Sequence, residues 1–495
     1  MKISVDWRAS LALVGTVLKY TIVPLSIPVS TGLFYREDVT PLLAAVAVAA
    51  VAGFGLERVG RDREIGGREA FLMVALAWLG VAVVGAVPFV VAGEGALAHP
   101  VNALFESMSG ITTTGATVVD DFSVHSRSIL MWRQVIQWLG GLGILVLATA
   151  VLSQLGVGGA HLMETESQTK SVNKLTPEIE TTAKLMLRLY SGLTAAVIAL
   201  LYGLHILGLA PEMSFYDAVA HSFTSISTSG FSPDPRSIEA YGSAVQWAFV
   251  PVMYVGATSF VLIYFVLRGD TSRLRRSEEF RFYTGSLLVL SLTVFSLLLL
   301  EGDGGFAESL RHSVFNVTSI VTTTGYASAD FSLWPSSAKH LLFLCMFLGG
   351  MAGSTTCSIK AVRWLVVTKA FRRDLYRNVH PDSVRPVRLG SGVVDEDTVR
   401  DIYAFVLVSL VLFFLGAVFV AVDSARAGLA VDEFEAMSAA AATFFNIGPA
   451  FGVAGPMESY GSFPVSTRMV MIAMMWVGRI EIIPVLVLLT PTYWT

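Results

Sequence analysis

Long apolar runs alternate with half-length apolar runs along this chain. A helix needs about 20 apolar residues to cross a bilayer, and ten runs reach that length. The first two cover about 9–33 and 40–58, and Pro24 and Pro28 predict a kink in the first. The other eight form four pairs, at about 70–92 with 130–154, 183–209 with 243–267, 281–300 with 339–368, and 401–423 with 467–490.

A half-length run lies inside each pair, at about 101–114, 214–229, 309–324 and 433–447. As a helix, each run would cover about 20 Å, roughly two thirds of the hydrocarbon core. Such a segment can only enter and turn back, with its returning backbone buried in protein or facing water. The pattern predicts an all-α integral membrane protein, with four tandem repeats of transmembrane helix, pore helix and transmembrane helix around a central pseudo-fourfold pore.

Domain limits follow from this repeat. Two extra N-terminal transmembrane helices occupy 1–65, and the four pore repeats occupy 66–160, 161–275, 276–395 and 396–495. The first apolar run is long and has no small-residue cleavage site, so we expect it to be retained as a crossing.

Composition supports a membrane protein. The 495 residues are 54% hydrophobic and only 15% charged, with a mean hydropathy of +0.65, whereas soluble proteins carry about a quarter charged residues. Arginine and lysine gather in the segments between repeats, 57–69, 155–184, 268–281 and 369–400. The positive-inside rule therefore predicts that these segments and both termini are cytoplasmic and that the half-length helices enter from outside.

One short polar phrase ends each half-length run. Its four copies are Thr112-Thr113-Thr114-Gly115, Ser227-Thr228-Ser229-Gly230, Thr322-Thr323-Thr324-Gly325 and the degenerate Phe445-Asn446-Ile447-Gly448. A single such phrase could arise by chance, but four at the same place in the same unit indicate an internal repeat.

The phrase suits a binding site for a dehydrated cation. Each half-helix would point its partly negative C-terminal end at the membrane centre, and glycine would allow the backbone to turn back with its carbonyls facing the axis. No carboxylate interrupts the four copies, which disfavours a divalent ion. The sixteen residues are therefore predicted to bind K+, with no organic cofactor in this chain. The alternative is that these glycines only cap or pack helices.

These motifs resemble those of the TrkH/KtrB/HKT superfamily of K+ transporters, and the TrkH branch most closely. The resemblance covers nearly the whole chain. It rests on the four phrases and on QWLGGLGILVLA at 137–148, LGVGGAHLMETE at 155–166, GSTTCSIKAVRW at 353–364 and GRIEIIPVLVLLTP at 478–491. In that family a glycine in all four filter loops goes with K+ selectivity, so Gly115 implies K+. Two crossings before the repeats are also a TrkH feature.

The resemblance also implies partners. TrkH-like proteins form homodimers that sit on a ring of nucleotide-binding, TrkA-type subunits in the cytoplasm of the cell. This chain has no G-x-G-x-x-G fingerprint after a strand, so any nucleotide sensing would belong to such a partner. The basic segment 369–400 is a candidate docking site, although an ordinary positive-inside loop would look the same. No nucleic-acid partner is expected.

The second crossing of the third repeat is interrupted by small and polar residues. They are Gly349, Gly350, Gly353, Ser354, Thr355, Thr356, Cys357 and Ser358, whereas the second crossings of the other repeats look cleaner. Such a sequence is a poor helix and is tolerated in mid-membrane only beside a cavity. The resemblance implies an intramembrane gating loop, although Thr356-Cys357-Ser358 replaces the usual glycine triplet. The alternative is close helix packing by small residues.

Three charged residues lie in or near apolar segments. Arg479 falls near the middle of the last crossing, where a charge is costly and usually functional, and the resemblance places it in the ion path as an electrostatic barrier. A local ion pair with Glu481 is the alternative. Lys360 ends the gating stretch and could reach the cytoplasm or share in gating. Glu106, on the first pore helix, is expected to be a hydrogen-bond partner rather than an ion ligand.

Two transport mechanisms remain open from the sequence. The first is K+ uptake across the plasma (inner) membrane through a gated, channel-like filter. The second is K+/H+ or K+/Na+ symport by alternating access, which would call for intramembrane carboxylates and inverted repeats. The repeats here are parallel, which favours the channel. No nucleophile–base pair, metal cluster or phosphate loop points to an enzyme.

Overall fold

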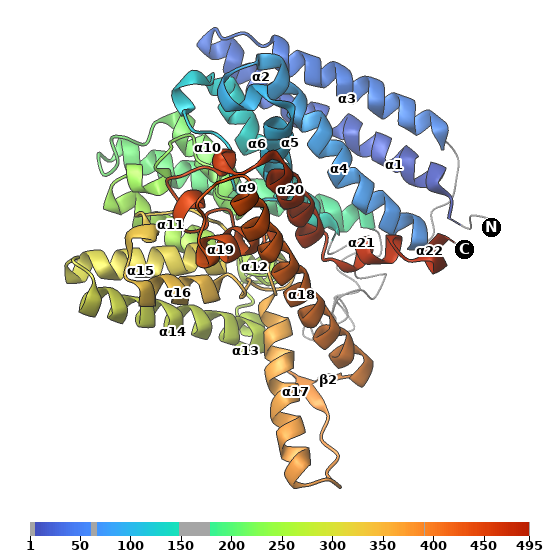
Figure 1. Ribbon diagram of the computed structural model, residues 1–495, viewed down its shortest axis with the longest axis vertical. Coiled ribbons are helices and arrows are strands. Elements are labelled where there is room, and N and C mark those ends of the chain that lie inside the picture. The colour runs from blue at the N-terminus through green and yellow to red at the C-terminus, as the bar shows by residue number, and fades with distance from the viewer. Residues whose placement is uncertain (1–4, 61–66, 148–178, 391, 495) are drawn as a thin grey trace.

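The computed structural model describes residues 5–60, 67–147, 179–390 and 392–494. Nearly all of the described elements are helices (Figure 1). The motif at 155–166 and the end of the predicted crossing 130–154 lie outside these residues.

Two apolar segments form an N-terminal helical hairpin that packs against the next long helix. They are α1 (Trp7–Tyr20) with α2 (Ile22–Tyr35), and α3 (Thr40–Val59), which lie beside α4 (Gly67–Ala92) at one side of the molecule (Figure 1). Pro28 lies inside α2 without a break, and the helix is interrupted at Thr21, between α1 and α2, within one 29-residue span. Pro24 explains this interruption, because proline has no N–H to donate to the carbonyl of Tyr20 one turn earlier.

A long helix followed by a short helix and further helices recurs four times along the chain. The members are α4, α5 (Pro100–Ile111) and α6 (Arg127–Leu147); α9 (Ile179–Ile206), α10 (Phe215–Ile226), α11 (Ser243–Gly256) and α12 (Phe260–Leu267); α14 (Glu278–Glu301), α15 (Phe306–Val321), α16 (Ser336–Cys345) and α17 (Ala361–Val379); and α18 (Glu396–Arg426), α19 (Glu433–Phe444) and α20 (Val465–Arg479). The half-length helices are thus present where the apolar pattern predicted them.

Short elements join or end these helices. They are η1 (Gly95–Ala98), η2 (Phe122–Val124), η5 (Ser237–Ala240), α13 (Ser272–Arg276), η6 (Phe331–Leu333), η7 (Gly452–Ala454), η8 (Tyr460–Ser462), α21 (Ile483–Leu488) and α22 (Pro491–Trp494). Two antiparallel strands, β1 (Val387–Leu389) and β2 (Gly392–Val394), pair Val387 with Val394.

The basic segment 369–400, for which an ordinary loop was one of two interpretations of the sequence, contains regular structure. Helix α17 continues to Val379 and projects from the rest of the molecule, with the strand hairpin beside it (Figure 1). Val387, Leu389 and Val394 are buried against α17 residues such as Val366, which fixes the hairpin to the helix.

Three of the predicted second crossings are broken, not one. The break expected within 339–368 is present, because α16 stops at Cys345 and α17 starts at Ala361. The crossing 243–267, predicted to be clean, bends by 104° between α11 and α12. The last crossing ends at Arg479, which therefore stands at a helix end rather than mid-helix, and Glu481 and Ile482 follow with φ of 63° and 60°.

The bend between α11 and α12 has a direct cause in hydrogen bonding. The N–H of Met351 donates to the carbonyl of Ala257 at 3.0 Å, and the N–H of Phe260 donates to the carbonyl of Gly353 at 3.0 Å. Backbone groups freed by one break are therefore satisfied by the other, as burial requires. The sequence of α11–α12 alone did not reveal this because the partner is nearly a hundred residues away.

Seven helices of the described chain are long and apolar enough to cross a membrane, or eight if α11 and α12 form one bent span. Ten crossings were predicted. The interrupted pairs α16–α17 and α20–α21 account for the difference, since neither supplies one continuous helix of sufficient length and apolar character.

Candidate functional site

Each short helix stops at the first residue of its polar phrase, and all four phrases have the same backbone conformation. The helices close at Thr112, Ser227, Thr322 and Phe445, with φ of −83°, −76°, −79° and −88°. The next residues are left-handed, with φ of 54° at Thr113, 49° at Thr228, 52° at Thr323 and 55° at Asn446. The glycines are also left-handed, at 82°, 79°, 78° and 104° for Gly115, Gly230, Gly325 and Gly448.

The four loops touch one another in a closed cycle. A Cβ added to each glycine would come within 3.0 Å of a carbonyl oxygen in another loop: Ser229 for Gly115, Thr324 for Gly230, Ile447 for Gly325 and Thr114 for Gly448. The last contact returns to the first loop, so the four phrases surround a common centre. Only glycine fits, because both the backbone angle and the space exclude a side chain.

The N–H groups of each loop are bonded back to its own short helix. Thr112, Thr113 and Thr114 donate to the carbonyls of Met108, Gly110 and Ser109 at 2.9, 3.0 and 2.8 Å. The second and third loops repeat all three bonds, and the fourth keeps two of them.

The carbonyl groups, in contrast, are mostly without donors. Of the sixteen phrase residues, those whose carbonyls accept a hydrogen bond within the described chain are Ser227, Ser229 and Gly448. Buried carbonyls normally find a donor. A cluster of unpaired carbonyls beside four helix C-terminal ends is chemically suited to a partly dehydrated monovalent cation.

A polar side chain on each short helix holds the chain that returns from the glycine. In the first repeat, Glu106 accepts hydrogen bonds from the hydroxyl of Thr117 and the N–H of Val118, both at 2.9 Å, and pairs with Arg133 at 2.7 Å. Both charged side chains are at most 1% exposed. Glu106 is thus a hydrogen-bond partner, as predicted.

The residues equivalent to Glu106 in the other three repeats were not predicted from the sequence. His221 bonds Ser232 at 3.1 Å, and Asn316 donates to Ser328 at 3.0 Å. In the fourth repeat, the hydroxyl of Ser438 accepts from the N–H of Phe451 at 3.1 Å. Glu106, His221 and Asn316 all stand nine positions before their glycine, a register that could have identified them.

Removing the charge from Arg133 alone should destabilise the protein strongly. Breaking a buried ion pair leaves an uncompensated charge and costs about 3–5 kcal/mol, so we expect Arg133→Met to lower the melting temperature of detergent-solubilised protein sharply. The double variant Glu106→Gln/Arg133→Met should recover part of that loss. A double variant no more stable than Arg133→Met would contradict the pairing.

The interrupted stretch between α16 and α17 lies against the left-handed residues of the first three loops. The N–H of Cys357 donates to the hydroxyl of Thr323 at 3.0 Å, and the hydroxyls of Thr355 and Thr228 are 3.0 Å apart. The sulfur of Cys357 is 4.0 Å from the hydroxyl of Thr113. The fourth loop differs, because the Asn446 amide donates instead to Thr114 and to the Met475 carbonyl.

The remaining residues of the predicted gating stretch hold its shape. Gly349 donates to Ile359 at 2.9 Å, the carbonyl of Gly350 accepts from Ala361 at 3.0 Å, and that of Gly353 accepts from Phe260. Ser354 and Thr356 hydroxyls are 2.8 Å apart, and the hydroxyl of Ser358 donates to Met346. The stretch is a folded loop, which argues against simple helix packing by small residues.

Arg479 joins three parts of the site. Its guanidinium donates to the carbonyl of Thr355 at 3.1 Å, the sulfur of Cys357 at 2.6 Å and the carbonyl of Gly140 at 2.9 Å, and the residue is 1% exposed. The alternative of a local ion pair with Glu481 is wrong in the described chain, since Glu481 pairs with Arg363 at the start of α17.

One interpretation of the sequence was that Lys360 reaches the cytoplasmic surface, but its side chain is buried. This lysine is the residue before α17 and is only 6% exposed. Lys360 is therefore buried at the end of the interrupted stretch, three residues before Arg363 of the Arg363–Glu481 pair.

The chain is similar to known proteins over most of its length. A family model named TrkH, described as a cation transport protein, matches residues 42–494. The chain is 37% identical over 87% of its length, and 87% of the relative's, to the Trk system potassium uptake protein TrkH of Halomonas elongata. It is 31% identical over 99% of both chains to the protein of that name from Salmonella typhimurium. The crystal structure of the potassium transporter TrkH from Vibrio parahaemolyticus superposes with a TM-score of 0.88 at 31% identity, covering 99% of this chain and all of that one.

Proposed function

This chain belongs to the TrkH family of cation transport proteins, and from that premise we propose that it carries K+ into the cell through a gated, channel-like filter. The observation that carries the proposal is the closed cycle of four glycine loops with unpaired carbonyls. The names of the relatives, which are potassium uptake proteins, give the ion.

The sixteen phrase residues form the K+ site in this proposal, within four pseudo-fourfold repeats that follow two extra N-terminal crossings. Buried carbonyls replace the hydration shell of the ion, and the ends of α5, α10, α15 and α19 add partial negative charge. Glycine at the fourth position of every copy keeps the cycle tight enough to favour one ion size. The membrane potential drives inward flow with about 2.3 kcal/mol per charge per 100 mV.

The interrupted stretch is the proposed gate. Its hydroxyls and Cys357 contact three of the four loops, so an ion that leaves the filter inward would meet it. Arg479 adds a positive charge at the same level and fastens the stretch to α6 and α20. Gating then requires the stretch to move away from the filter loops, with Lys360 at its end.

The assembly proposed for the protein follows its family. The relatives are named as parts of a Trk system, which supports an assembly of several components. The proposed components are a homodimer of this chain in the plasma (inner) membrane and a cytoplasmic TrkA-type nucleotide-binding ring. Both termini would then be cytoplasmic. The projecting α17 and its hairpin carry Arg372, Arg377, Arg385 and Arg388 and are the candidate docking surface for such a regulator.

Symport by alternating access is the competing mechanism. Unitary currents in planar bilayers separate the two: discrete openings at a fixed voltage support the channel, whereas a fixed K+:H+ or K+:Na+ stoichiometry with no openings supports the carrier. The described chain places two buried acids beside the gate. Glu481 is paired with Arg363, and Glu279 accepts hydrogen bonds from the N–H groups of Ala352 and Val362 at 2.7 and 3.2 Å. This favours the channel, since proton coupling needs a carboxylate that can titrate.

Gly115→Ser should let Na+ pass. The added side chain would displace the Ser229 carbonyl and loosen the cycle on one side, so we expect the K+/Na+ permeability ratio to fall by about tenfold, or about 1.4 kcal/mol. Flux into proteoliposomes with each ion measures this. An unchanged ratio in correctly folded protein would count against the filter assignment.

A further inference from the structure

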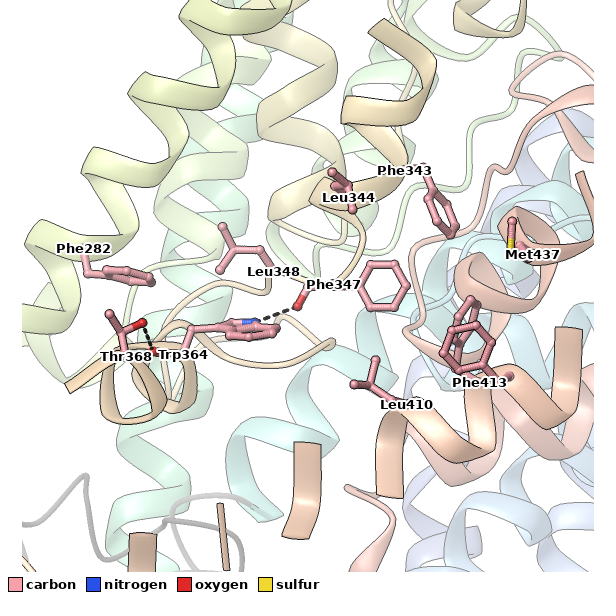
Figure 2. Close-up of a pocket in the computed structure, with 11 residues that line it drawn as sticks. Phe282, Phe343, Leu344, Phe347, Leu348, Trp364, Thr368, Leu410, Phe413 and Met437 are labelled. Carbon is pink, nitrogen blue, oxygen red and sulfur yellow. Dashed lines mark hydrogen bonds between the residues drawn. The ribbon is translucent and has the colours of Figure 1, made fainter. Parts of the chain in front are cut away.

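A large apolar pocket lies behind the proposed gate. Its volume is about 530 Å³, and its walls come from α14, α16, the chain just after α16, α17, α18 and α19 (Figure 2). That size is within the range of pockets that hold small molecules or parts of them.

Among the described residues that line the pocket, no polar side chain is without a hydrogen bond. Its polar side chains are Thr368, whose hydroxyl donates to the carbonyl of Trp364 at 2.8 Å, and Trp364, whose indole donates to the carbonyl of Phe347 at 2.9 Å (Figure 2). The other lining side chains are aliphatic, aromatic or Met437. An occupant must therefore be an alkyl or aryl group without hydrogen-bonding needs.

The mouth of the pocket faces the region that lipid would fill. Leu344 and Phe414, which line it, are 62% and 55% exposed. Helices α14 and α18 on its flanks are apolar enough to cross the membrane and carry further exposed apolar side chains, among them Leu288 and Leu407. Lipid tails are the solvent that surrounds such exposed apolar side chains on a membrane-spanning helix.

We propose that this pocket takes one acyl chain of a membrane phospholipid, and that its occupancy biases the gate. The second half of the proposal rests on the gate assigned under the proposed function; the binding half does not.

Aromatic contacts connect the pocket to both the gate and the filter. Phe347 stands two residues before Gly349, and its ring centroid is 5.0 Å from that of Phe445, the first residue of the fourth filter phrase. Phe413 lies 5.2 Å from Phe347 and 6.2 Å from Phe445. A chain that props these rings apart or lets them collapse would shift the start of the gating stretch.

The Trp364 indole reinforces this coupling. Its hydrogen bond to Phe347 joins the two ends of the interrupted stretch. The pocket wall therefore connects the chain just after α16 to the start of α17. An acyl chain against that wall would stabilise one distance between these two ends over another. It would then bind one state of the gate more tightly than the other and shift the equilibrium between them.

Binding is tested by photolabelling. The protein, reconstituted into phosphatidylethanolamine/phosphatidylglycerol vesicles that contain phosphatidylcholine with a diazirine on one acyl chain, should be labelled on peptides that contain 343–348 and 410–414. Leu410→Trp fills the pocket and should reduce this labelling at least about tenfold. Leu407→Trp, one turn away on the exposed face of α18 and outside the pocket, should leave it unchanged. Equal labelling in both variants, or none in the unmodified protein, would overturn the proposal.

Coupling to the gate is tested by K+ flux in the same vesicles. Leu410→Trp should change basal flux at least about threefold at an unchanged K+/Na+ ratio, and Leu407→Trp should not. Unchanged flux despite lost labelling would overturn the regulatory half. Leu348→Phe, a smaller filling change, repeats the test if Leu410→Trp fails to elute as a single species.

A second copy of this chain is the other possible occupant. If Leu344→Cys forms disulfide-linked dimers in the vesicles while acyl labelling is absent, the pocket is an interface between copies and the lipid proposal fails. None of these outcomes depends on which ion passes the filter. Failure of the proposed function would show instead as the absence of K+ flux through the unmodified protein.

Discussion

Replacing Gly325 by alanine should reduce K+ uptake by at least about tenfold, equivalent to about 1.4 kcal/mol. Two effects add at this position. The backbone has φ of 78°, which costs a non-glycine residue about 1–2 kcal/mol. The new Cβ would also overlap the carbonyl oxygen of Ile447 and approach Pro449, so the third and fourth loops could not keep their spacing.

Gly428 provides a matched control. Its φ is 76°, but no atom of the described residues lies within 4 Å of an added Cβ. Gly428→Ala therefore carries the same backbone strain without the contact with a neighbouring loop. We expect its K+ flux, measured with Rb+ or K+ in proteoliposomes and normalised to folded protein, to stay within about twofold of the unmodified protein. Equal losses in both variants would mean that backbone strain, and not the cycle of carbonyls, explains the effect.

The long helices, the four short helices and the glycine phrases could be predicted from the sequence, because each depends on a local run of apolar residues or a short motif. A run such as 433–447 is too short to cross whatever its surroundings, and α19 begins at Glu433 and ends at Phe444. The resemblance to the TrkH branch is confirmed by the family model and by the structural match.

The breaks in the second crossings were harder to predict because their causes are distant in the sequence. The α11–α12 segment is apolar and reads as one span, yet its bend is stabilised by backbone bonds to 351–353. Glycine and serine in the third repeat predicted the break there, because they are poor helix formers. No local feature of the sequence indicated that the carbonyl of Gly353 would accept a hydrogen bond from the N–H of Phe260.

Side-chain partners within the site were also out of reach of the sequence. Glu481 is two residues from Arg479 and looked like its partner, but the left-handed turn at Glu481 and Ile482 directs its carboxylate to Arg363 instead. Arg479 is left to bind main-chain oxygens of Thr355 and Gly140. Proximity along a helix therefore failed as a guide at the point where the helix ends.

Neutralising Arg479 should raise basal K+ flux. The guanidinium is a buried positive charge against the proposed gate, and it fastens that stretch through Thr355 and Cys357. Unit charges 4 Å apart interact by about 4 kcal/mol at an effective dielectric constant of 20, so removing a charge even at a greater distance should lower the barrier to a permeating cation by at least about 1.4 kcal/mol, a tenfold gain in rate. We expect this gain from Arg479→Gln, measured as K+ flux without any regulatory partner.

Two further variants separate charge from fastening. Arg479→Lys keeps the charge but loses the planar fork that reaches Thr355, Cys357 and Gly140 together, so flux that stays low in Arg479→Lys and rises in Arg479→Gln identifies the charge as the barrier. Flux that rises equally in both identifies the fastening of the stretch. Arg468→Gln removes a charge from the other end of α20, where Arg468 bonds Asn102, and should leave flux unchanged. A fall in K+ flux in folded Arg479→Gln would contradict any role of Arg479 in the gate. Loss of an electrostatic barrier, or loss of the bonds that hold the gating stretch in place, could only increase the flux.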